Sequence, residues 1–66
     1  MGWQDYIEVR RDVMLGKAVF KGTRLTVEHV IRELAAGLSA DELLANYPML
    51  KKEHIRAALQ YAGRAD

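Results

Sequence analysis

The stretch from Gly16 to Val27 holds the residues whose types and spacing look most able to do chemistry. It is basic and punctuated by glycine, and it reads Gly16-Lys17-Ala18-Val19-Phe20-Lys21-Gly22-Thr23-Arg24-Leu25-Thr26-Val27. Backbone amides of a glycine-rich loop can cradle a phosphate, and a lysine can reach it. A Walker loop, however, needs a glycine, four residues and then Gly-Lys-Ser/Thr, and this stretch has neither that spacing nor that ending. Nucleotide hydrolysis is therefore not expected.

The Gly22-Thr23-Arg24 block has two interpretations. In the first it is structural, because Gly22 supplies a positive φ at a turn and the next two residues join an N-terminal arm to a helix. In the second, Arg24 acts with Lys17 and Lys21 to bind a partner. The planar fork of a guanidinium suits either the phosphate backbone of a nucleic acid or a carboxylate on a protein. The sequence leaves both interpretations open.

The two histidines, His29 and His54, do not form a metal or catalytic site by their spacing. Neither has a second histidine, cysteine or carboxylate at ligand spacing, and the chain has no cysteine. No set of nucleophile, base and orienting residue can be assembled around them. We expect partly buried, structural histidines, and hence no enzyme, metal, cofactor or small-molecule substrate.

A second basic group lies toward the C-terminus. Residues 52, 56 and 60 recur every four positions and share one face of a predicted helix. In a helix-turn-helix protein such a helix enters the major groove, where arginine and glutamine read base edges and lysine meets phosphate. The candidate DNA-binding residues are Lys51, Lys52, Arg56 and Gln60. The alternative is an ordinary solvated helix face.

The elements that must position these residues begin with a β arm over residues 1–25. Tyr6 to Val9 and Lys17 to Lys21 are rich in β-favouring residues and are separated by Arg10-Arg11-Asp12. Two strands are not stable alone in water, so the arm must lie on the helices or pair with another chain. Its free edge predicts a twofold, strand-exchanging dimer.

Three helices follow over residues 26–64. The first is predicted at 27–36, with Thr26 as N-cap and Gly37 just beyond its end. The second is predicted at 40–46, since Ser39 and Glu42 have the spacing of a capping box and Tyr47-Pro48 ends it. The third begins near Lys51 or Lys52, where a lysine stands in the place of a capping residue. The expected buried stripes are Val27, Val30, Ile31, Leu34 and Ala35 in the first helix, and Ile55, Ala58, Leu59 and Ala62 in the third.

The predicted fold is therefore mainly α: a single domain over residues 1–66, with a three-helix, homeodomain-like helix-turn-helix bundle and a short N-terminal β arm or hairpin. A chain of 66 residues buries only about 60% of its unfolded surface. Added burial in a homodimer or with a partner protein is expected. Trp3 is costly to expose near a terminus, and we expect it to dock on a neighbouring chain. Phe20 and Tyr47 are expected in the core.

Charge and hydropathy limit the expected binding partners and cellular location of the protein. The formal net charge is only +1, with basic ends and an acidic middle, which excludes an indiscriminate nucleic-acid binder. No stretch approaches the roughly 20 apolar residues of a membrane span, and the N-terminus lacks the features of a signal peptide. A cytoplasmic protein that does not bind membranes is expected.

The chain resembles the small bacterial family known as domain of unknown function 433. Its signature is approximately Gly-Lys-Pro-x-Ile-x-Gly-Thr-Arg-x-x-Val, an apolar helix, Gly-x-Ser-x-x-Glu-x-x-x-x-Tyr-Pro, and a last helix containing Ile-x-x-Ala-Leu-x-Tyr-Ala. The matching residues are Gly16-Lys17, Gly22-Thr23-Arg24, Val27, Gly37, Ser39, Glu42, Tyr47-Pro48, Glu53, Ile55, Ala58-Leu59 and Tyr61-Ala62. Three positions depart from it: Ala18 replaces a proline, Phe20 an aliphatic residue and Lys51 a capping threonine.

This resemblance implies a homeodomain-like fold and a role as the antitoxin half of a toxin–antitoxin pair. Members commonly sit beside a nuclease toxin of the PIN type, which they are thought to bind and silence. The leading expectation is an antitoxin-like protein that neutralises such a toxin and, as a dimer, binds its own promoter. Lys17, Lys21, Arg24 and Trp3 are the candidate partner-binding residues. The runner-up is a helix-turn-helix DNA-binding regulator without a toxin partner, and a module that binds proteins through its strand edge is a third expectation.

Overall fold

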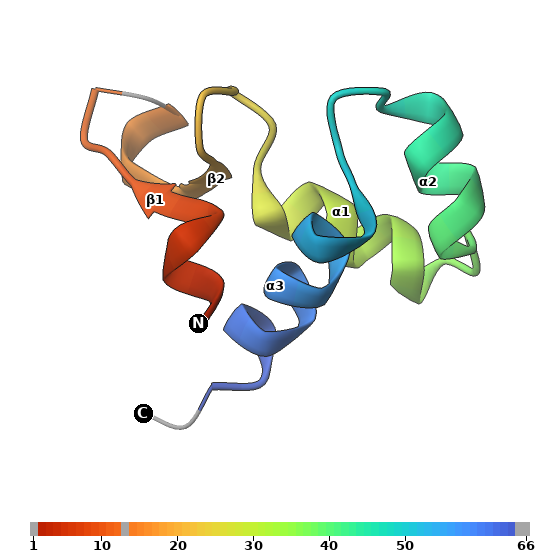
Figure 1. Cartoon of the computed structure of the whole chain (residues 1–66). Coiled ribbons are helices and arrows are strands. Elements are labelled where there is room, and N and C mark those ends of the chain that lie inside the picture. Colours follow the sequence, from red (N-terminus) through yellow and green to blue (C-terminus); the bar gives the residue numbers. More distant parts are fainter. Residues whose placement is uncertain (1, 13, 65–66) are drawn as a thin grey trace.

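Two short strands precede three helices in the computed structural model, which describes residues 2–12 and 14–64 (Figure 1). Two single turns of 3₁₀ helix accompany the strands. The elements in chain order are η1 (Trp3–Asp5), β1 (Ile7–Val9), η2 (Met14–Gly16), β2 (Ala18–Phe20), α1 (Val27–Ala35), α2 (Ala40–Asn46) and α3 (Lys52–Ala62). The mainly helical fold with an N-terminal hairpin is confirmed, and the helix bounds differ from the predicted ones by at most one residue where both were given.

The hairpin joins the two strands in antiparallel register, with Ile7 opposite Phe20 and Val9 opposite Ala18. On its other side β2 forms a single bridge to Thr26, through Val19. Among the described residues, β1 therefore keeps one unpaired edge. Both Ile7 and Phe20 are buried and join the core of the helices, so the arm is stabilised by packing on its own bundle.

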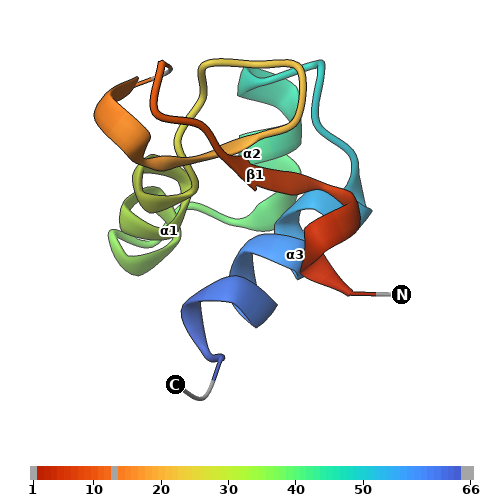
Figure 2. The same ribbon diagram turned by 90° about the vertical axis from the view of Figure 1, so that its left-hand side faces the viewer.

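The core forms where the hairpin, α1 and α3 meet, with α2 closing one side (Figures 1 and 2). Phe20 is fully buried there, as expected, whereas Tyr47 is only half-buried. η1 packs along α3, and β2 packs on α1. The buried members of the core are Ile7, Phe20, Val27, Val30, Leu43, Leu50, Ile55, Ala57 and Ala58.

The first two helices begin with the caps that the sequence predicts. Thr26 Oγ1 accepts the amide of His29 at 3.1 Å, and Gly37 follows α1 with a φ of +107°. In α2, Ser39 Oγ accepts the amide of Glu42 at 3.1 Å, and Glu42 Oε1 accepts the amide of Ser39 at 2.9 Å. Hydrogen bonds to the Glu42 carboxylate, first from the Ser39 backbone amide and then from the Ser39 side chain, hold the pKa of Glu42 below its usual value.

Helix α3 begins at Lys52 without a side-chain cap from Lys51. Instead, His54 Nδ1 accepts the backbone amide of Lys51 at 3.0 Å. The rings of Tyr6 and Phe20 meet the same imidazole edge-on, with centroids 5.2 and 5.7 Å away. One histidine therefore replaces half of a capping box and ties the helix start to the hairpin.

The predicted buried stripe of α3 is partly wrong. Ile55 and Ala58 are buried, but Leu59 is 54% exposed, Ala62 is exposed and Ala57 is buried instead. The reason is that η1 packs on a second side of α3. The covered face of the helix therefore includes Ala57 and leaves Leu59 and Ala62 exposed. In α1, Ala35 is likewise exposed although it was predicted to be buried.

Candidate partner-binding surfaces

The connection from β2 to α1 forms a closed turn at the end of the molecule opposite the C-terminus (Figures 1 and 2). Gly22 has a φ of +77°, as predicted, which an L side chain rarely adopts. Thr23 closes the turn twice, because its hydroxyl donates to the Phe20 carbonyl at 2.8 Å and accepts the Leu25 amide at 3.1 Å. The Phe20 amide in turn donates to the Leu25 carbonyl at 3.1 Å. Backbone groups and one threonine therefore suffice to hold the turn.

Arg24 takes no part in these hydrogen bonds. Its side chain is exposed, and so is that of Lys21 on the other side of Gly22. Within residues 2–12 and 14–64 neither cation has a hydrogen-bond or ion-pair partner. Arg24 also borders a shallow hollow of about 400 Å³ whose other charged lining residues are Glu8, Arg10 and Asp12. Arg10 and Asp12 pair with each other there at 2.9 Å.

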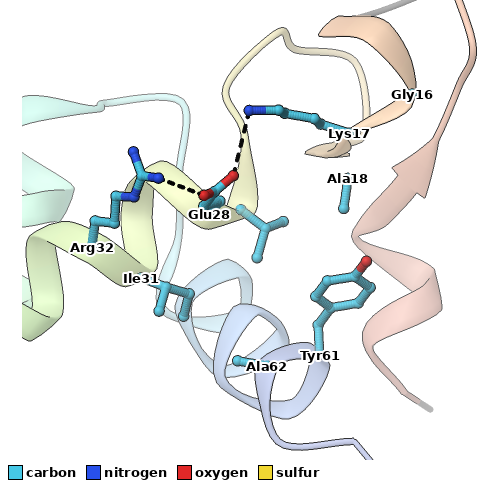
Figure 3. Close-up of a pocket in the computed structure, with 9 residues that line it drawn as sticks. Gly16, Lys17, Ala18, Glu28, Ile31, Arg32, Tyr61 and Ala62 are labelled. Atoms are coloured by element: carbon cyan, nitrogen blue, oxygen red, sulfur yellow. Dashed lines mark hydrogen bonds and ion pairs between the residues drawn. The ribbon is translucent and has the colours of Figure 1, made fainter. Parts of the chain in front are cut away.

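Lys17 is placed differently from the other two cations. Its Nζ lies 3.6 Å from Glu28 Oε1, and Arg32 reaches the other oxygen of the same carboxylate at 2.7 Å (Figure 3). These three side chains form the charged rim of a groove of about 540 Å³ between the hairpin, α1 and the end of α3. The apolar lining of the groove consists of Ala18, Val27, Ile31, Tyr61 and Ala62. The structure thus separates Lys17 from the turn that carries Arg24.

Trp3 packs on its own chain. Its ring meets Tyr61 edge-on, with centroids 4.9 Å apart, and its side chain is half-buried. The guanidinium of Arg64 lies 3.9 Å from the centre of the same tyrosine ring. The predicted docking of Trp3 on a neighbouring chain rested on its being exposed, and that premise does not hold.

The four candidate DNA-binding side chains, Lys51, Lys52, Arg56 and Gln60, are all exposed. None has a side-chain partner in the described part of the chain. The face is not purely basic, however, because Glu53 lies on it. A hollow beside the face is lined by Gly2 and Tyr6 together with Glu53, Arg56 and Gln60. The N-terminal segment therefore flanks the surface that would enter a DNA groove.

A polar cluster that the sequence reasoning missed joins α1 to the connection between α2 and α3. Tyr47 Oη donates to Glu33 Oε1 at 2.8 Å and lies 3.0 Å from His29 Nε2, which is itself 3.1 Å from Glu33 Oε1. The hydrogen bond to Glu33 raises the pKa of Tyr47 above its usual value. His29 is exposed, so the expectation of partial burial was wrong. The i,i+4 spacing could have indicated the pair of His29 and Glu33, but nothing in the sequence indicates Tyr47.

The described residues contain no group of three or more histidine, cysteine, aspartate or glutamate side chains able to hold a metal ion. Of the helices in that part of the chain, none is both long and apolar enough to cross a membrane.

Three comparisons with known proteins bear on identity. A family model described as "Protein of unknown function (DUF433)" matches residues 7–62. The uncharacterized protein y4eO of Sinorhizobium fredii (strain NBRC 101917 / NGR234) is 41% identical over 51 residues, which are 77% of this chain and 23% of that protein. The crystal structure of a DUF433 member protein from Anabaena variabilis ATCC 29413 superposes with a TM-score of 0.84 at 36% identity, covering 88% of this chain and 57% of the other. The chain spans about a quarter of the curated relative and just over half of the solved one.

Proposed function

The chain belongs to the DUF433 family, whose function is unknown, and from this premise we propose that it is a non-enzymatic, antitoxin-like protein that silences a PIN-type nuclease by direct contact. The nuclease class comes from the family resemblance. The turn that Gly22, Thr23 and Arg24 form supports the contact.

The proposal is supported chiefly by the different roles of the three residues in this turn. Gly22 supplies the backbone conformation and Thr23 supplies the hydrogen bonds, whereas the Arg24 side chain has no partner in the described residues. A side chain that does not hold the turn is free to bind elsewhere. Because the turn is closed by its own hydrogen bonds, it presents Arg24 from a fixed backbone, which lowers the entropy lost on binding.

The proposed target is the acidic, metal-binding pocket of the nuclease. A guanidinium donates two parallel hydrogen bonds to a carboxylate, and such charge-assisted pairs are about twice as strong as neutral ones. Arg24 placed on the pocket carboxylates would compete with the metal ion for them or block the entry of RNA. Lys21, exposed across Gly22, adds positive charge on the same turn and speeds the encounter with an acidic surface.

Co-expression of the chain with the product of its neighbouring gene, which we propose to be a PIN-type nuclease, tests this role. The wild-type chain should co-purify with the nuclease and restore growth. Arg24→Ala should lose both effects, while Arg32→Ala, which removes an exposed arginine that is already paired with Glu28, should retain them. Failure of the wild-type chain to co-purify or to rescue growth would refute the antitoxin role.

A second function, promoter binding by α3, has its own supporting observation. Lys52, Arg56 and Gln60 are exposed on one face of the helix without side-chain partners in the described chain. Fluorescence anisotropy with the upstream DNA should then show salt-dependent affinity that falls when both Lys52 and Arg56 become alanine. DNA binding together with no nuclease binding would favour the regulator over the antitoxin.

A further inference from the structure

The polar cluster of His29, Glu33 and Tyr47 brings together three side chains whose donor atoms bind metal ions. Tyr47 Oη lies 2.8 Å from Glu33 Oε1 and 3.0 Å from His29 Nε2, and Nε2 lies 3.1 Å from the same carboxylate oxygen. Imidazole nitrogen and carboxylate oxygen are common ligands of zinc and its neighbours in the first transition row, and the phenolate oxygen of tyrosine ligates iron. The cluster is thus a candidate ligand set, although a phenol stands where a third histidine or carboxylate is usual.

The three atoms have the spacing of one face of a coordination octahedron. Nitrogen and oxygen ligands bind zinc at about 2.0–2.2 Å, so two ligands at right angles around the ion lie about 2.8–3.1 Å apart. The sides of the observed triangle, 2.8, 3.0 and 3.1 Å, have the same lengths. Hydrogen bonds within the cluster hold this spacing, so an ion seated above the triangle replaces them without movement of the backbone.

The negative charge of Glu33 favours a bound cation. Glu28, earlier in the same helix, is neutralised by Lys17 at 3.6 Å and Arg32 at 2.7 Å. Glu33, in contrast, has no lysine or arginine within ion-pair distance in the described part of the chain. Its side chain is only 25% exposed, so water screens its charge less than at the surface. His29 is 52% exposed, which leaves a path for an ion and its water ligands.

We propose that His29 Nε2, the Glu33 carboxylate and Tyr47 Oη together bind one divalent first-row transition-metal ion such as Zn²⁺, with water on its remaining positions. Binding leaves the imidazole proton on Nδ1, and the phenolic proton that Glu33 accepts is released to water as Tyr47 binds as phenolate. The ion joins α1 to the connection between α2 and α3. No metal site was expected at His29 from the sequence, because the third ligand lies 14 positions beyond Glu33. The site is independent of the proposed nuclease contact through Arg24.

Isothermal titration calorimetry with Zn²⁺ alone, in a buffer that does not bind zinc, tests the proposal. The wild type should bind one ion per chain and release protons. Its melting temperature should rise by about 10 °C when the free Zn²⁺ concentration is about a hundred times the dissociation constant. His29→Ala, Glu33→Gln and Tyr47→Phe should each weaken binding by at least about tenfold. Circular dichroism checks that each variant keeps the helical fold.

Glu28→Gln is the matched control, because it removes a carboxylate of the same helix that lies outside the cluster. This variant should bind Zn²⁺ as tightly as the wild type. Heteronuclear NMR of the imidazole nitrogens gives an independent readout. Zn²⁺ should shift the signal of His29 Nε2 and leave both ring nitrogens of His54 unchanged, since His54 Nδ1 already accepts the Lys51 amide.

A difference absorption spectrum separates a ligand role of Tyr47 from a purely structural one. Zn²⁺ should produce tyrosinate absorption in the wild type and none in Tyr47→Phe. The proposal is overturned if the wild type binds no zinc at about 1 mM, if His29→Ala binds it as tightly as the wild type, or if the tyrosinate signal is absent.

Discussion

The turn at Gly22 and the start of α3 both carry exposed basic residues, yet the two regions differ in what surrounds these cations. In each region another side chain does the local structural work, Thr23 in the turn and His54 in the helix. Around the turn, Arg24 shares a hollow with Glu8 and Asp12 but pairs with neither, whereas Glu53 and the N-terminal segment flank the basic face of α3. An exposed basic residue is thus a candidate for binding where neighbouring residues already make the hydrogen bonds that fix its backbone.

The largest effect on stability is expected in α3, from His54→Ala. The change removes the acceptor for the Lys51 amide and two edge-on ring contacts, which together should cost about 2 kcal/mol in the free energy of unfolding. His54→Phe keeps a ring but not the acceptor and should lose about half as much. Urea denaturation measures both, and equal losses for the two variants would contradict the capping role.

A somewhat smaller loss is expected in the turn, from Thr23→Val. Valine matches threonine in shape but can neither donate to the Phe20 carbonyl nor accept the Leu25 amide, which should cost about 1.5 kcal/mol. Thr23→Ser retains both hydrogen bonds and should stay within about 0.5 kcal/mol of the wild type. If serine were as destabilising as valine, the hydroxyl would not be what closes the turn.

The pH dependence of folding stability should reveal smaller stabilising contributions from two ionisable side chains, Glu42 and Tyr47, which lie outside both regions. The lowered pKa of Glu42 means that its contribution is present at neutral pH and is lost as the pH falls below 4.5 through the folded-state value. The raised pKa of Tyr47 has the opposite sign, so its contribution is present below pH 10 and is lost as the pH rises through the folded-state value. Thermal melts should show a flatter acid limb for Glu42→Gln and a flatter alkaline limb for Tyr47→Phe. Unchanged limbs would count against these hydrogen bonds.

Local patterns were enough to predict the two strands and three helices of this fold, but neither 3₁₀ turn. Ser39 with Glu42, Thr26 and Gly37 act through residues close in the chain, and the helices begin and end where these signals indicate. Contacts across the chain were not predictable in the same way. Nothing local shows that η1 covers α3, and hence that Leu59 is exposed and Trp3 is not free.

The sequence indicated which residues could form a binding site, but not which of them lie together in the structure. Lys17 and Arg24 share one stretch of sequence, yet Lys17 pairs with Glu28 at a groove while Arg24 remains on the turn. Lys17 precedes the extended strand β2 and Arg24 follows it, and β2 packs on α1, which carries Glu28.

If Arg24 serves binding and not folding, then Arg24→Ala should retain the stability of the wild type and lose affinity for the partner. Urea denaturation gives the free energy of unfolding, and titration calorimetry gives the affinity for the proposed nuclease partner. We expect a free energy of unfolding within about 0.5 kcal/mol of the wild type and an affinity lower by at least about tenfold. Unchanged affinity, or a loss of stability above about 1 kcal/mol, would contradict it.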